Sequence, residues 1–195
     1  MLVKNGTPVH QRSMINFVEF PVDPSMFRDD LRPYVSEIIG QHGLEEWKAV
    51  VLTNELHHHM GLWSIVGAKM GVRAREMLSA PFEKMTVVSS TGMKPPYSCL
   101  NDGLQVSTGA SLGRGTISVV DLGHPSVDFM YENKKLSLRV KPEVVGEIED
   151  VIKEFSDKYV FQSVRYFDEL DKISVRYWLK WDRSDLFAET IAADR

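Results

Sequence analysis

Apolar residues along the chain follow two kinds of spacing, and the spacing predicts the helices and strands. In segment 64–78 they recur every three or four positions, as on one face of a helix. Pro142 suits the first turn of a further helix over 143–159, and a last helix is predicted over 167–181. A shorter helix is predicted within 100–111. These four helices are expected in addition to the N-terminal helix described below.

Short apolar runs predict the strands. The unbroken run Ala49–Leu52 indicates a buried strand over 48–56, because strands covered on both faces are apolar at successive positions. Other strands are predicted over 84–90, 116–122, 126–131, 135–140 and 186–192. The order predicts an α+β fold, with helices packed on a mixed β-sheet that includes a meander, and a C-terminal helical segment.

The first 44 residues differ from the rest and are predicted to form an N-terminal arm and helix. Residues 1–25 contain three prolines and one strand-like stretch, over 15–20. A helix is expected from Ser25, interrupted at Pro33 and ended by Gly40 and Gly43. Residues 45–195 are then a single metal-binding domain, for the reasons given below.

Composition narrows the class of protein. The chain is 43% apolar and 26% charged, with a net charge of −4, as in ordinary soluble domains. No basic block predicts binding to nucleic acid, and no apolar run is long enough to predict a membrane helix. One cysteine excludes an internal disulfide, and we expect a cytoplasmic protein.

Three of the six histidines are consecutive, at positions 57 to 59. On an extended backbone His57 and His59 point to the same side, and His58 points away. Cys99 would add a thiolate, giving a three-ligand set that suits zinc and leaves a fourth position open. The alternative is a polar surface turn and an inert buried thiol.

Two segments resemble the FmdE family, named for a subunit of formylmethanofuran dehydrogenase. The first family signature reads roughly H-x-H-x-C-P-G-x-x-x-G-x-x-x-G, and His57, His59, Gly67 and Gly71 match it. The second is "CLNDGLQVSTGASLGRGTI", which begins at Cys99. The likeness extends over residues 45–192. It implies an FmdE-like fold and about one transition metal ion per chain, with zinc as the first expectation. The ion would be held by His57, His59 and Cys99.

The chain also departs from the family pattern. Gly61 stands where the family has a cysteine, and Ala110 replaces the cysteine of its TGC segment. The C-terminal pair of CxxC motifs found in some members, which resembles a zinc ribbon, is absent from the sequence. The first change removes a possible thiolate ligand or nucleophile.

Two functions follow from the resemblance and the predicted site. One is a metal-binding accessory or regulatory protein, linked by resemblance to molybdenum or tungsten formylmethanofuran dehydrogenase. The other is a hydrolase or lyase that uses the open metal position to activate water. Asp102 is the candidate catalytic residue, as a base or as a group that orients a ligand; it could equally cap the helix that follows.

The sequence also predicts partners. Gly67 and Gly71 share one helix face, where another backbone could approach closely, and this face and the meander suggest a homodimer. The open metal position would also accept a small-molecule ligand. The glycine-rich segment ending at Arg114 is read as a turn, since it lacks the lysine and spacing of a phosphate-binding loop.

Overall fold

The computed structural model describes residues 16–193. Within this range the helices are α1 Val35–His42, α2 Leu44–His57, α3 Leu62–Leu78, α4 Leu100–Thr108, α5 Pro142–Lys158 and α6 Val164–Lys180. The strands are β1 Thr86–Ser89, β2 Ile117–Val119, β3 Ser126–Tyr131, β4 Lys134–Val140 and β5 Phe187–Ala193. The four helices predicted over 64–181 and five of the six strands predicted after residue 44 are confirmed, with shifted ends.

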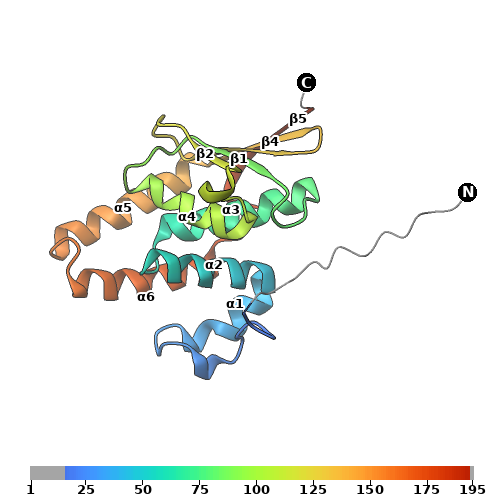
Figure 1. Cartoon of the computed structure of the whole chain (residues 1–195). Coiled ribbons are helices and arrows are strands. Elements are labelled where there is room, and N and C mark those ends of the chain that lie inside the picture. Colours follow the sequence, from blue (N-terminus) through green and yellow to red (C-terminus); the bar gives the residue numbers. More distant parts are fainter. Residues whose placement is uncertain (1–15, 194–195) are drawn as a thin grey trace, which may run out of the picture.

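In Figure 1 the sheet lies at the top of the molecule, and the helices lie below it. Its strand order is β2-β1-β3-β4-β5. Strands β1 and β2 are parallel, whereas β1–β3, β3–β4 and β4–β5 are antiparallel. The sheet is therefore mixed, and the predicted α+β class is confirmed. The expected meander is wrong, because β1 lies between β2 and β3, so that only β3 and β4 of its strands pair with each other. In the described range no helix is long and apolar enough to cross a membrane.

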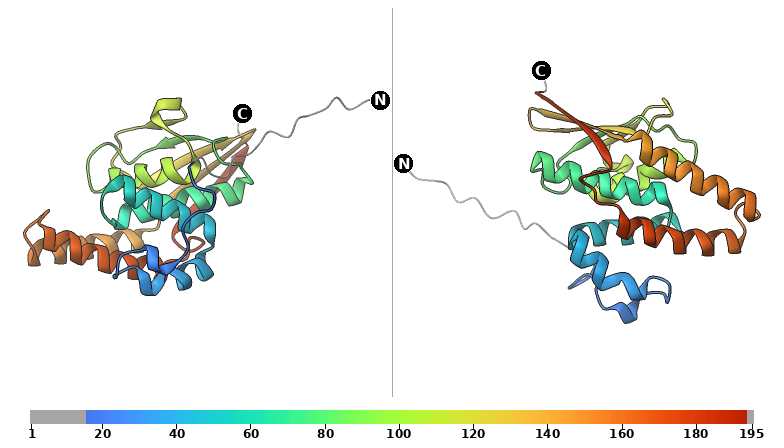
Figure 2. Two further views of the ribbon diagram at one scale, coloured as in Figure 1. Left: turned by 60° about the horizontal axis from the view of Figure 1, so that its bottom comes forward. Right: turned by 180° about the vertical axis from the view of Figure 1, so that it is seen from behind.

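Helix α3 is the central element of the fold. Every residue from Leu62 to Val72 is buried. Its Val66 and Met70 belong to a core shared with the sheet and α4, and its Ile65 and Ala68 to a second core shared with α1, α2 and α6. A helix that is apolar on most sides is covered on most sides. Figure 2 shows α3 between the sheet and a group of helices that includes α1 and α6.

Glycines in α3 and α4 let the two helices touch backbone to backbone. A Cβ atom on Gly67 would lie 2.1 Å from the Leu100 carbonyl oxygen, and one on Gly103 would lie 2.2 Å from the Ala68 nitrogen. The face that suggested a homodimer is thus covered by α4 of the same chain. Because Cys99 immediately precedes Leu100, this contact also fixes the position of the cysteine.

Replacing Gly67 with alanine should lower the free energy of unfolding by about 3 kcal/mol, since the backbone of α4 would have to move. Gly146→Ala in α5 is the matched control, because a Cβ there meets nothing within 4 Å. It should raise stability by about 0.5–1 kcal/mol. Urea unfolding measures both, and equal effects of the two variants would contradict the close packing.

The strand predicted over 48–56 is wrong, because these residues belong to helix α2. The buried residues of α2 include Glu46, Trp47, Val50 and Thr53, which follow helical spacing. Because two of these four residues are polar, the spacing of the apolar residues alone does not reveal the buried face of this helix. A run of four apolar residues cannot by itself distinguish a strand from a buried helix.

The described part of the N-terminal segment packs against α2 and α6 (Figure 2). The strand predicted over 15–20 is not formed by residues 16–20, and its first residue lies outside the described part. The helix expected from Ser25 is wrong in its first part, because only short 3-10 turns at Pro24–Met26 and Arg32–Tyr34 precede α1, which begins after Pro33. Gly40 lies inside α1, and the helix ends at Gly43, whose φ is +83°.

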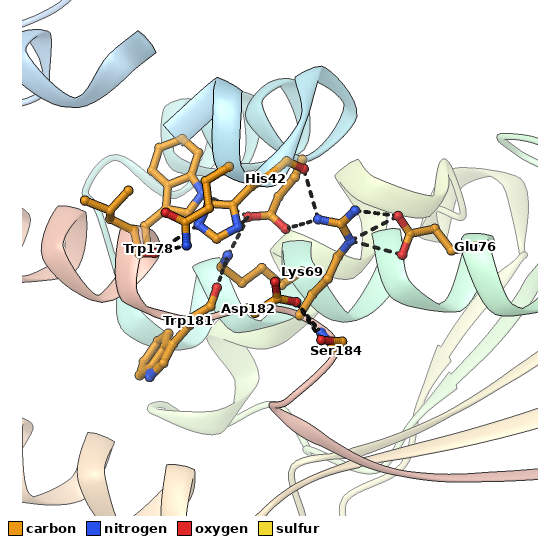
Figure 3. Close-up of polar contacts among 11 residues, drawn as sticks. His42, Lys69, Glu76, Trp178, Trp181, Asp182 and Ser184 are labelled. Carbon is orange, nitrogen blue, oxygen red and sulfur yellow. Dashed lines mark hydrogen bonds and ion pairs between the residues drawn. The ribbon is translucent and has the colours of Figure 1, made fainter. Parts of the chain in front are cut away.

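A buried ion network joins the C-terminal part of α6 and the segment after it to α1, α2 and α3 (Figure 3). Lys69 and Glu46 are fully buried and paired, and Lys69 also donates to the Trp181 carbonyl at 2.7 Å. Glu46 further accepts from Trp178 and from Arg183, at 3.2 and 3.1 Å. Burial lowers the pKa of Lys69, which the Glu46 charge opposes.

Candidate functional site

The three histidines occupy the end of a helix and the turn after it. His57 is the last residue of α2, and His58 follows in the left-handed conformation with φ of +63°. The extended backbone expected here is therefore wrong. The turn nevertheless brings the rings of His57 and His59 together, with 4.3 Å between centroids, and leaves His58 exposed.

Asp102 holds the His57 ring. It lies in the first turn of α4, and its Oδ2 is 2.7 Å from His57 Nδ1. The start of α4 has no side-chain cap, so Asp102 does not serve as one. A carboxylate on one ring nitrogen fixes the orientation of an imidazole and sets the tautomer that leaves Nε2 free, as in many metal-bound histidines.

His57 and Cys99 line the same cavity, of about 280 Å³. Cys99 is a half-buried free thiol at the start of α4. The His57 Nε2 atom is buried and has no hydrogen-bond partner. Buried polar atoms are nearly always paired, and an unpaired one needs an explanation. An unshared Nε2 beside a thiol is a donor arrangement suited to a soft metal ion.

The electrostatics of the site are dominated by Asp102. Its hydrogen bond, followed by the proximity of Cys99, raises the pKa of His57 to about 9, although burial acts in the opposite direction. In metal-free protein at neutral pH His57 is therefore protonated. A metal ion that binds Nε2 must displace this proton.

His59 faces a different environment from His57. It lines a second cavity, of about 300 Å³, on the side of the N-terminal segment, and its ring packs on Phe167 with 4.8 Å between centroids. Burial and the neighbouring His57 lower its pKa to about 4. His59 therefore stays neutral, which is the form that binds metal ions.

Two residues that the sequence did not single out hold the histidine turn. Asp171 of α6 is 4% exposed and accepts the Met60 backbone N–H at 2.8 Å. Its other oxygen pairs with Arg28 of the N-terminal segment, also at 2.8 Å. Arg28 and Asp171 are 143 positions apart, so no local motif could have pointed to them.

Several other polar and aromatic residues are not part of the cavity beside His57. His124 is exposed, and Arg114 pairs with Glu83 at 2.8 Å in a turn, as predicted. Trp63 and Phe129 belong to the core, and Tyr97 packs edge-on against Trp63. These aromatic residues therefore stabilise the fold rather than form a pocket.

The donors present fit a metal ion in part. Within residues 16–193 no three His, Cys, Asp or Glu side chains stand arranged around one point as a metal site. His57 and Cys99 share a cavity, and the His57 Nε2 is unpaired, so two of the three predicted donors fit. His59 is in contact with His57 but lies at the other cavity, so its part in a site stays a prediction.

The pKa of His57 predicts how stability depends on pH in chelator-treated protein. A histidine whose pKa rises from 6.5 to about 9 on folding stabilises the fold fully below pH 6.5. This contribution should be lost as the pH rises to 9. It is on the order of 2 kcal/mol, less than the full shift would give, because solvent screens an Asp102 side chain that is 33% exposed.

Urea unfolding at pH 6.5 and 9.5 measures this loss. Asp102→Asn should remove most of the difference between the two pH values, since the Asp102 hydrogen bond is the largest cause of the shift. A wild-type difference that persists unchanged in Asp102→Asn would assign the pH dependence to other groups.

Fold and site together define a class: an α+β domain in which the start of α4, packed closely on α3, brings a cysteine and an aspartate to the same cavity as a histidine at the end of α2. The FmdE family profile, described as "FmdE, Molybdenum formylmethanofuran dehydrogenase operon", matches residues 56–188, more than half of the chain. The chain belongs to the FmdE family.

One solved structure similar to this chain is the crystal structure, at 1.90 Å resolution, of a tungsten formylmethanofuran dehydrogenase FmdE-like protein from Syntrophus aciditrophicus. The sequences are 16% identical and the TM-score is 0.47. The match covers 77% of this chain and 73% of that one. No curated protein matches this chain in sequence.

Proposed function

We propose that this FmdE-family protein binds about one transition metal ion per chain, zinc in the first place. The observation that carries the proposal is the His57 ring: Asp102 occupies Nδ1, and the buried Nε2 is unpaired beside Cys99. His57 and Cys99 would hold the ion. His59 would join them by a rotation of its side chain, since the two rings are already neighbours.

In this proposal each residue has a defined role. Asp102 orients His57 and supports the imidazole as a donor. Cys99 supplies a thiolate, and Asp171 holds the turn that carries His59 through the Met60 amide. The metal would supply a Lewis-acidic centre with a free position for a small ligand.

We propose an accessory or regulatory role in the metabolism of molybdenum or tungsten formylmethanofuran dehydrogenase, following the family relationship. The hydrogen bond between Asp102 and His57 favours this role over catalysis, because a carboxylate already bound to His57 is less free to act as a base. A metal-dependent hydrolase or lyase is the second candidate. It is supported by the same Asp102, which also lines the cavity where a substrate would lie. The homodimer and the cytoplasmic location stay predictions.

Alkylation of Cys99 tests the proposal. A metal-bound thiol is deprotonated but shielded, so Cys99 in zinc-loaded protein should react with iodoacetamide at least tenfold more slowly than after addition of a chelator. The sequence has no other cysteine, so the measured rate belongs to Cys99 alone. A rate that the chelator leaves unchanged would count against the site.

A further inference from the structure

We propose that the cavity beside His57 binds a small monoanion with an apolar tail, whose charged head lies against the metal ion. This inference rests on the proposed metal site and adds the chemical class of its ligand. It is carried by three properties of the cavity, namely the distribution of polar groups, the charge and the size.

The cavity has one polar end. His57, Cys99 and Asp102 lie together, and the apolar part of the wall is formed by Met93, Pro95, Leu112, Ile117 and Val119. Ser98, which directly precedes Cys99, adds a hydroxyl group to the wall. Two further polar side chains of the wall are already bonded within the protein, Asn101 to the Gly92 carbonyl and Gln105 to the Leu112 amide. A ligand with a single polar head and an apolar body matches this distribution.

The charge of the cavity favours a head group with one negative charge. A divalent metal ion bound to one thiolate carries one remaining positive charge, and the Asp102 charge is directed to His57. In the described part of the chain no lysine or arginine lines this cavity. Phosphate groups in proteins are held by several charged donors, which are missing from this wall. A carboxylate or a thiolate is sufficient.

The size of the cavity limits the tail. Its volume of about 280 Å³ lies just below the range of roughly 300–1,000 Å³ for pockets that bury drug-sized ligands. At the ~30 Å³ that a water molecule occupies in the liquid, the cavity has room for roughly ten non-hydrogen atoms. Met93 and Leu112 are 70% and 62% exposed, so the tail would also cover an apolar rim. A nucleotide would not fit.

The test is a titration of protein loaded with Co²⁺, whose visible spectrum reports ligands at the metal. Acetate, butyrate and hexanoate are added in turn, with methyl phosphate as the comparison. Affinity should rise up to about fourfold for each methylene, until the chain fills the cavity. Methyl phosphate should bind more weakly than butyrate.

Two leucine variants provide the control for the wall. Leu112→Ser lies on the cavity and should reduce the gain from acetate to hexanoate severalfold, with Co²⁺ uptake unchanged. Leu122→Ser is a matched control, because Leu122 is 58% exposed and is not part of the cavity wall. It should leave the series unchanged.

The possible failures can be told apart. If Co²⁺ binds stoichiometrically but affinity does not depend on chain length, or methyl phosphate binds tighter than butyrate, the ligand class is overturned while the metal site stands. If no Co²⁺ binds to folded protein, the proposed function fails and the ligand class fails with it.

Discussion

Replacing Glu46 with glutamine is expected to lower the free energy of unfolding by about 3–5 kcal/mol. The substitution keeps the shape of the side chain but leaves the Lys69 ammonium buried without its counter-charge. Removing one partner of a buried ion pair is costly because the other partner stays desolvated. Urea unfolding at pH 7 measures the change.

Two further variants make this result specific. Glu45→Gln, on the same helix, should change stability by less than about 0.5 kcal/mol, because the Glu45 side chain is 61% exposed in its pairs with Lys48 and Arg75. The double variant Glu46→Gln/Lys69→Met should recover much of the loss, since no buried charge is left alone at this position. A double variant that is less stable than Glu46→Gln would contradict this account of the network.

Replacing His57 with alanine is expected to reduce zinc affinity by more than 100-fold. The comparison is with Asp102→Asn, which removes only the group that orients the ligand and should cost about 10- to 100-fold. Cys99→Ser should resemble His57→Ala, because both residues contribute donors to one cavity. Isothermal titration with zinc, after removal of bound metal, measures the four affinities.

The neighbouring histidines complete this experiment. His58 is exposed and does not line the cavity beside His57, so His58→Ala should bind zinc as the wild type does. His59→Ala should lose affinity if its side chain rotates onto the ion, as proposed. Three adjacent histidines can also bind metal without a defined geometry. An equal, mild loss at all three positions, with no effect of Cys99→Ser, would indicate that kind of binding.

Elements whose apolar residues repeat regularly could be predicted from the sequence, whereas α2 could not. Helix α3 and the strands β3 and β4 were predicted because their apolar residues repeat regularly. Helix α2 was read as a strand because its buried face includes Glu46 and Thr53. The charge that Glu46 buries is balanced by Lys69 and Arg183, which are distant in sequence, and a local pattern cannot reveal such a pairing.

The candidate site shows the same limit. The two family segments led to His57, Cys99 and Asp102, and these three residues do line one cavity. The expected geometry of the histidines was wrong in its backbone, because an extended chain was assumed where a helix ends. The contribution of Asp171 and Arg28 could not be foreseen, since it depends on how α6 and the N-terminal segment pack against the turn.

The central claim is that this protein holds a metal ion at His57 and Cys99, and metal content tests it most directly. Elemental analysis should be made on protein purified without an affinity column, together with a native mass spectrum. We expect about one zinc or similar transition metal ion per chain in the wild type, and little in His57→Ala of equal fold. Folded wild-type protein that carries no metal and takes up no added zinc would contradict the account.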